Sequence, residues 1–264
     1  MLTVSELYIY PVKSLGGISL KEATLTDRGF ENDRRWMLVD ERHQFLSQRE
    51  VPEMALLQVS LVEDGLLIQH KDRVDPALQI PFTTEGESCR VTVWGDSCMA
   101  QWVSRQADAW FSEMLSTPCR LVYMPDASRR EVDPGYAQHR EITSFSDGFP
   151  LLLIGQASLD DLNTRLSLPL PMDRFRPNIV FAGGEPYQED VMSHFRIAGI
   201  DFFGVKRCAR CVITTIDQLT AEKGKEPLRT LSDYRRSQNK IYFGQNLLFQ
   251  GEGKITVGDL LIHK

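Results

Sequence analysis

Long apolar runs, an export signal and an excess of positive charge are all missing from this chain of 264 residues. The longest purely apolar run extends only from Phe149 to Ile154, whereas a helix needs about 20 apolar residues to cross a bilayer. The first ten residues lack a basic segment, and Glu6 interrupts them early. A formal net charge of −6 disfavours general binding to nucleic-acid backbone. We therefore expect a soluble, cytoplasmic protein without a membrane or nucleic-acid partner, in which any anion site is local.

Cysteine is scarce, with five residues in the whole chain. An odd number of cysteines without an export signal favours reduced thiols over a disulfide scaffold. The hydrophobic content of 42% is enough to bury a full core, so we expect one large or two moderate domains.

Signatures of common catalytic folds are absent too. The chain has no Gly-x-Ser-x-Gly elbow, Walker loop or Rossmann fingerprint, and none of its five histidines has a partner at catalytic spacing. Cys208 and Cys211 form one Cys-x2-Cys pair, but no second pair or histidine pair stands at zinc-ligand spacing. The cysteine spacing of an iron–sulfur cluster is also missing.

Short strands separated by turn signals dominate the first hundred residues, which is the pattern of a barrel or sandwich. A helical stripe follows from Ser104 to Leu115, with Ser104 as the expected N-cap. The second half is again rich in strands, with a helix expected over 156–166 and capped by Ser158, and a polar loop over 125–147. The predicted fold class is therefore mostly β with some helix. The predicted strands are 3–10, 18–25, 36–39, 55–61, 66–69, 90–93, 120–123, 151–154, 179–181, 194–197, 200–205, 212–216 and 255–257.

The segment from Lys206 to Asp217 places two cysteines among cations, directly before a β-branched run. Nearby positive charge stabilises a thiolate, which is the form that attacks electrophiles or binds a soft metal. The run Val212–Ile216 is typical of a strand, so the cysteines are expected at a loop-to-strand junction. That position differs from the helix N-terminus of a thioredoxin-type pair. Packing by small, inert cysteines is the alternative that the local sequence leaves open.

Several cations at strand ends are suited to a phosphate-bearing cofactor. Lys13 and Ser14 follow a strand, and we expect Pro177 to restrict Arg176 to extended geometry. Strand alternation puts Arg34 and Arg35 on opposite faces, and we expect Arg34 to point inward. A single cation at a strand end is usually solvated, so none of these motifs is diagnostic alone. The turn-rich segment 144–150 is equally consistent with a plain Asp–Gly turn and with a cofactor loop.

Taken together and in order, these motifs resemble a known family. Tyr10-Pro11-Val12-Lys13-Ser14, Asp33-Arg34-Arg35-Trp36, Phe175-Arg176-Pro177-Asn178-Ile179 and Cys211-Val212-Ile213-Thr214-Thr215 are similar to motifs of MOSC-domain proteins of the mitochondrial amidoxime-reducing component and its bacterial YcbX-like relatives. Lys225-Glu226-Pro227-Leu228 and Phe243-Gly244-Gln245-Asn246 extend the match. The resemblance implies two β-barrel-like domains, a MOSC N-terminal β-barrel domain over 1–118 and a MOSC domain, a pyruvate-kinase-like β-barrel, over 119–264.

The resemblance also implies a molybdenum cofactor, a molybdopterin whose molybdenum takes a thiolate from the protein. By motif position that ligand, and the catalytic residue, is Cys211. The implied cofactor-binding residues are Lys13, Ser14, Arg34, Gly148, Phe149, Pro150, Arg176, Arg210 and Asn246. Cys208 has no implied ligand role. Pyridoxal phosphate binding is a further property associated with the family in general.

The function implied is reduction of N-hydroxylated small molecules. Some bacterial relatives carry a C-terminal plant-type ferredoxin domain whose cysteines are missing here, so the electrons are expected from a separate ferredoxin- or flavoprotein-like partner. Two alternatives stay open: a sulfur-transfer protein carrying a persulfide on Cys211, and a carrier that holds the molybdenum cofactor without catalysis.

Overall fold

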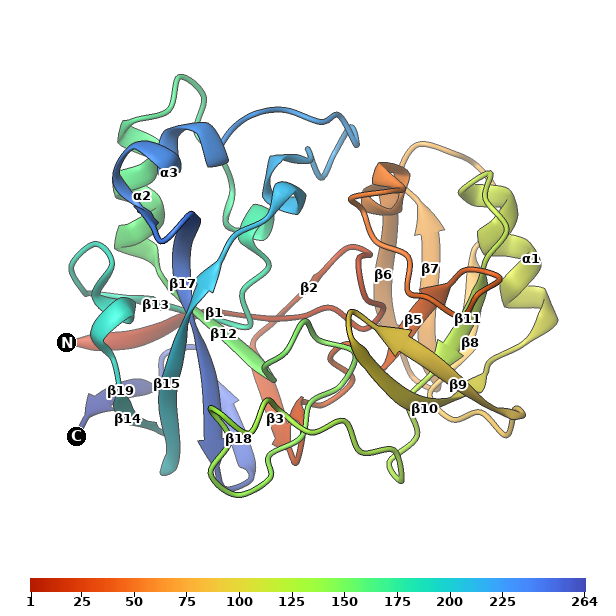
Figure 1. Ribbon diagram of the computed structural model, residues 1–264, viewed down its shortest axis with the longest axis horizontal. Helices are drawn as coiled ribbons and strands as arrows, with labels where there is room; N and C mark the ends of the chain where they lie inside the picture. Colours follow the sequence, from red (N-terminus) through yellow and green to blue (C-terminus); the bar gives the residue numbers. More distant parts are fainter.

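Strands dominate the computed structural model, which describes residues 1–264 and forms two lobes lying side by side (Figure 1). In the first lobe the largest sheet closes on itself, because the strand over 151–155 pairs on one side with the strand over 179–182 and on the other with the strand over 240–250. The result is a seven-stranded barrel, and β2 (Ile18–Leu20) and β16 (Arg236–Ser237) extend its margins. Around the barrel the order is β12 (Leu151–Gly155), β13 (Ile179–Ala182), β1 (Leu2–Ile9), β19 (Leu260–His263), β14 (His194–Ile197), β15 (Ile200–Ala209) and β17 (Lys240–Gln250).

The second lobe contains two smaller antiparallel sheets and a helix. One sheet has the order β5 (Trp36–Val39), β11 (Arg120–Tyr123), β10 (Asp96–Trp102) and β9 (Ser88–Val93). The other consists of β6 (Leu57–Val62), β7 (Gly65–His70) and β8 (Leu78–Pro81), and η1 (Pro52–Leu56) precedes it. Helix α1 (Arg105–Met114) packs Ala107 and Phe111 into a core that also contains Trp36.

A short third sheet links the ends of the chain. In it β3 (Glu22–Thr26) pairs with β4 (Gly29–Phe30) and with β18 (Gly253–Thr256). Strand β1 also belongs to the barrel, so the first thirty residues share sheets with the C-terminal half. The predicted boundary between residues 118 and 119 stays a prediction. What matters for a site is that β1 leaves the barrel at Ile9 and carries Lys13 and Ser14 into the junction between the lobes.

The mostly β fold class is confirmed, and most predicted strands fall within two residues of observed ones. The predicted helix over 104–115 is α1, and the Ser104 hydroxyl accepts the Ala107 amide as its N-cap. The helix expected over 156–166 is α2 (Gln156–Thr164), but its predicted Ser158 cap is wrong. Gly155 is the N-cap, while the Ser158 hydroxyl donates to the buried Glu189 carboxylate instead.

The strand predicted over 212–216 is also wrong. Strand β15 ends at Ala209, and Val212–Thr215 forms the 3-10 turn η4. The hydroxyls of Thr214 and Thr215 donate to the carbonyl oxygens three residues earlier, at 3.0 and 2.8 Å, and so stabilise a turn that competes with strand pairing. The cysteines therefore lie at a strand-to-turn junction. Helix α3 (Leu228–Tyr234) and the long strand β17 were not predicted.

Glu189, in the 3-10 turn η3 (Gln188–Val191), is fully buried beside α2. Burial raises the pKa of its carboxyl to about 7, although the Ser158 hydroxyl opposes the rise. A carboxyl whose pKa is raised in the folded state contributes stability at pH values below its pKa in the unfolded chain. That contribution is lost as the pH rises through the folded-state pKa, which is about 7 for Glu189. The shift corresponds to on the order of 3 kcal/mol.

We therefore expect the free energy of unfolding to fall between pH 5 and 8, and Glu189→Gln to remove most of this fall. Urea unfolding at several pH values measures it. Glu185→Gln, an exposed change four residues earlier, should leave the slope as in the wild type. Parallel slopes for wild type and Glu189→Gln would contradict the expectation.

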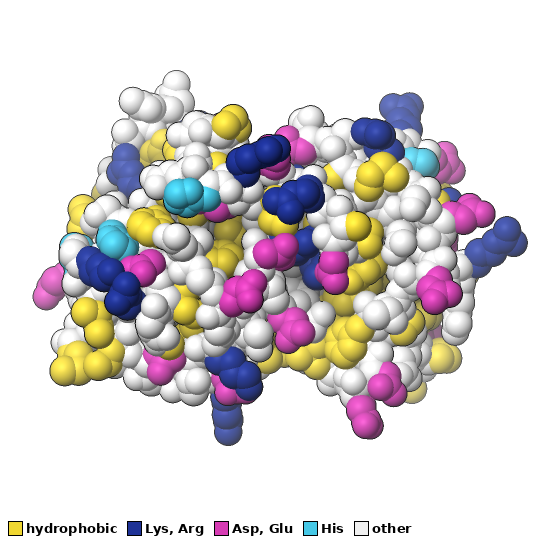
Figure 2. Space-filling model, turned by 90° about the horizontal axis from the view of Figure 1, so that it is seen from below, with side chains coloured by type: hydrophobic (Ala, Val, Ile, Leu, Met, Phe, Trp, Pro, Cys, Tyr) yellow, Lys and Arg dark blue, Asp and Glu magenta, His cyan; other side chains and the backbone are white.

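The chain contains no helix with the length and apolarity required to cross a membrane. The face seen from below in Figure 2 carries Asp and Glu side chains near its middle, where the two lobes meet. All five cysteines are free thiols, and the two of the Cys-x2-Cys pair are the only ones that are not buried.

Candidate functional site

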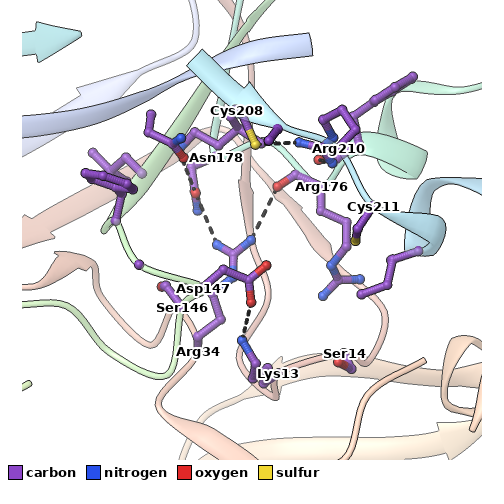
Figure 3. A pocket seen from close by; sticks show the side chains of 18 residues that line it. Lys13, Ser14, Arg34, Ser146, Asp147, Arg176, Asn178, Cys208, Arg210 and Cys211 are labelled. Atoms are coloured by element: carbon purple, nitrogen blue, oxygen red, sulfur yellow. Dashed lines mark hydrogen bonds and ion pairs between the residues drawn. The ribbon is translucent and has the colours of Figure 1, made fainter. Parts of the chain in front are cut away.

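A pocket of about 120 Å³ lies at the junction of the lobes and opens onto an outer cavity of about 590 Å³. The two are contiguous, since they share part of their lining, including Asp147, Phe149, Cys208 and Asn246. Side chains from widely separated segments meet in the inner pocket (Figure 3). It is lined by Lys13, Ser14, Arg34, Ser146, Asp147, Gly148, Phe149, Leu151, Leu152, Phe175, Arg176, Asn178, Cys208, Ala209, Arg210, Cys211, Ile213 and Asn246.

The ends of strands and turns position these side chains. Lys13 and Ser14 follow β1, Arg34 precedes β5, and Arg176 follows the 3-10 turn η2 (Met172–Phe175). Three of them have left-handed backbone, with φ of 69° at Ser14, 51° at Arg34 and 54° at Arg176. The extended geometry predicted for Arg176 is therefore wrong, because this residue ends the 3-10 turn η2 as its left-handed C-cap. Such non-glycine residues cost about 1–3 kcal/mol each and cluster at functional sites. The strain therefore supports a binding role for this wall of the pocket.

The buried ring of Tyr10 holds two of these arginines in place. The guanidinium carbons of Arg34 and Arg176 lie 4.5 and 4.2 Å from its centroid. Gly17 leaves the space that the ring needs, because a Cβ there would lie 2.5 Å from a ring carbon. The Tyr10 hydroxyl has no hydrogen-bond partner, and burial raises the pKa of the phenol. Tyr10 thus contacts the pocket arginines with its ring and not with its hydroxyl.

Arg34 is the inward arginine, as predicted. Its Nη1 donates to Asp33 at 2.5 Å and to Asn178 at 3.1 Å, and its Nη2 donates to the Arg176 carbonyl at 3.3 Å. Arg35 points away and donates to the Met124 carbonyl. Strand alternation is not what turns Arg34 inward, because Arg34 precedes β5 and has a left-handed backbone.

Lys13 is buried and meets the loop before β12. Its ammonium donates to the Phe145 carbonyl at 2.7 Å and forms an ion pair with Asp147 at 2.6 Å. Burial lowers the pKa of Lys13, and Asp147 opposes that effect. Lys13 and the Trp94 indole hold the pKa of the Asp147 carboxyl well below its usual range, and the Asp147 side chain is itself 67% exposed.

Arginines also reach the cysteine segment. The Arg210 Nη1 donates to the Cys208 sulfur at 3.0 Å, and its Nη2 donates to the Phe175 carbonyl at 2.7 Å. The cation that the sequence placed beside both thiols therefore contacts Cys208. Burial nevertheless raises the pKa of the Cys208 thiol, with Arg210 opposing it. Cys211 is half-buried and lines the same pocket.

Of the predicted site residues, only Pro150 lies outside the pocket lining; it is buried behind the loop. Sequence reasoning missed Asp147 and Asn178 as polar members of the site, although both stand inside quoted motifs or segments. It also missed the apolar floor, which consists of Leu151, Leu152, Phe175 and Ile213. A sequence pattern marks such residues as core, and nothing in it distinguishes a pocket floor from ordinary packing.

The residues present fit an anionic, phosphate-bearing cofactor with a soft metal. Lys13, Arg34, Arg176 and Arg210 line the pocket together with one carboxylate, that of Asp147. The Nε of Arg210 is buried without a partner, and a Cβ at Gly148 would meet open space. Burial lowers the pKa of Arg176 to about 10, which fits a cation that lacks an anionic partner of its own. The half-buried Cys211 supplies a soft sulfur donor.

Comparisons with known proteins find similarity along nearly the whole chain. Residues 1–118 match the MOSC N-terminal beta barrel domain and residues 140–261 match the MOSC domain. The chain is 34% identical to mitochondrial amidoxime-reducing component 1 of Mus musculus and 33% identical to that of Homo sapiens, each over 97% of this chain and 81% of the relative. It is 33% identical to the molybdenum cofactor sulfurase of Oryza sativa subsp. japonica, again over 97% of this chain but over only 34% of that larger protein.

Proposed function

This chain belongs to the MOSC-domain family that includes the mitochondrial amidoxime-reducing components, and we propose that it is a molybdenum-cofactor-dependent reductase of N-hydroxylated compounds. The relatives support a function associated with the molybdenum cofactor. The observation that carries the finer proposal is one pocket that combines a half-buried thiol, four cations and an open outer cavity.

In this proposal Cys211 is the protein ligand of molybdenum. Lys13, Ser14, Arg34, Arg176 and Arg210 hold the phosphate and pterin, and Gly148, Phe149 and Asn246 line the remaining wall. Pro150 supports the loop from behind. When bound, the cofactor supplies the two-electron, oxygen-accepting chemistry of the reaction. The chain itself contributes orientation, positive charge and a partly enclosed site.

The overall reaction breaks the N–O bond of an N-hydroxylated substrate and forms an N–H bond. The oxygen leaves as water, so each turnover takes up two electrons and two protons. The outer cavity shares Asp147, Phe149 and Cys208 with the inner pocket, so a substrate that enters it would lie against this shared wall, while Cys211 lines the inner pocket only.

The test is reduction of benzamidoxime to benzamidine by the wild-type protein purified from a host that makes the cofactor, with reduced methyl viologen as electron donor. We expect near-stoichiometric molybdenum and turnover that requires it. If molybdenum-loaded protein reduces no N-hydroxylated compound, the reductase proposal is wrong. The alternative of a carrier that holds the cofactor without catalysis would then remain.

A second candidate is sulfur transfer, which the similarity to a molybdenum cofactor sulfurase and the two thiols of one pocket favour. Cys211 would then carry a persulfide. Persulfide-selective labelling of Cys211 in metal-free protein would support this candidate over the reductase.

A further inference from the structure

Positive charge is concentrated next to the Cys211 segment, although the chain as a whole is acidic. Residues 206–240 contain nine Lys or Arg and four Asp or Glu, against 30 and 36 in the full sequence. Five of these cations are exposed and form no ion pair. We call them the basic face: Lys223, Lys225, Arg229, Arg236 and Lys240.

Two backbone contacts join parts of the basic face to the Cys211 segment. The Arg210 amide donates to the carbonyl of Ile241, the residue after Lys240, at 2.7 Å. The Gly224 amide, between Lys223 and Lys225, donates to the Thr215 carbonyl of η4 at 2.9 Å. Figure 1 shows α3 and the loop before it at the same, upper end of the barrel, and this loop reaches toward the junction of the lobes.

Two of the four acidic side chains in residues 206–240 are engaged. Asp217 forms an ion pair with Arg174 at 2.6 Å, and the Glu226 carboxylate accepts the Thr230 amide at 3.0 Å. Glu222 and Asp233 are the exposed acids that remain. The exposed charge of the face is therefore positive, in contrast to the acidic middle of the lower face in Figure 2.

Exposed apolar side chains lie among these cations. Val212, directly after Cys211, is 53% exposed, and Leu219 is 72% exposed. A separate groove of about 290 Å³ is lined by Leu168, by Lys223 and Lys225, and by the acidic residues Asp217, Glu222 and Glu226. A small apolar centre with a charged rim is suited to a transient protein encounter, in which complementary charge steers association.

We propose that the basic face is the docking surface for an acidic electron-transfer protein. This proposal rests on the proposed function, whose reaction takes up two electrons from an external donor. A one-electron donor would dock twice in each turnover and pass one electron each time, while water supplies the two protons. The position of Val212 brings a docked donor next to the predicted metal ligand.

The test compares two electron donors on the cofactor-loaded protein, with benzamidoxime as substrate. One is reduced methyl viologen, which needs no docking surface, and the other is a reduced, acidic plant-type [2Fe–2S] ferredoxin. The variant is Lys225→Glu with Lys240→Glu, two exposed residues whose side chains form no hydrogen bond. We expect its KM for ferredoxin to rise at least about tenfold at low ionic strength, with the viologen-driven rate unchanged.

The matched control is Lys21→Glu with Arg42→Glu, which changes the same charge at exposed positions outside the basic face. It should keep the wild-type KM for ferredoxin. Failure of the wild type with viologen would count against the proposed function itself. If viologen-driven turnover is normal, then either equal KM values for both double variants or no ferredoxin-driven turnover would overturn the docking proposal alone.

Discussion

Replacement of Cys211 by serine is expected to remove bound molybdenum and to lower turnover of benzamidoxime by more than about a hundredfold, since loss of a second-shell partner alone costs 10–100-fold. A hydroxyl is a hard donor and a poor substitute for a thiolate toward this metal. The fold should survive, because the Cys211 backbone is held without the sulfur. Its carbonyl accepts the Thr214 amide at 3.2 Å and the Thr214 hydroxyl at 3.0 Å.

Elemental analysis and pterin fluorescence of the purified variants measure this effect. Cys208→Ser is the matched control, because Cys208 lines the same pocket and its sulfur is bound by Arg210. We expect that control to retain molybdenum. Loss of the metal from Cys208→Ser, together with its retention in Cys211→Ser, would exchange the assignments of the two cysteines.

Replacement of Tyr10 by leucine is expected to be the next most damaging change. It removes the ring that contacts Arg34 and Arg176, and two cation–π contacts together are worth about 1–4 kcal/mol. Without the ring, both arginines gain freedom, so the pocket loses preorganisation and holds the cofactor more weakly. We expect the pterin retained per folded molecule to fall at least about tenfold.

Tyr10→Phe separates this role from a general loss of stability. It keeps the ring and removes a buried hydroxyl that has no hydrogen-bond partner, so it should be neutral or slightly stabilising. Thermal unfolding followed by circular dichroism identifies a temperature at which both variants are folded, and retained pterin is then measured there. Equal retention in Tyr10→Leu and Tyr10→Phe would show that the ring does not position the arginines.

The accuracy of the sequence predictions varied with the range of the interactions involved. Periodicity located α1 and most strands, because alternation and helical spacing are local consequences of burying one face. The prediction over 212–216 failed because hydroxyl-to-carbonyl bonds of Thr214 and Thr215 outweigh the β preference of branched side chains. The Ser158 cap failed because a distant carboxylate, that of Glu189, uses the hydroxyl.

By itself, the sequence determined the mostly β class, the two-part motif order and the residue types of the candidate site. These follow from local pattern and from motifs that lie within a few residues. Only the tertiary structure decided that Lys13 meets Asp147 and that Tyr10 lies against two arginines. Each of these contacts joins residues more than 20 positions apart in the sequence. Whether such groups meet depends on how the barrel closes and how the lobes pack, which no local spacing encodes.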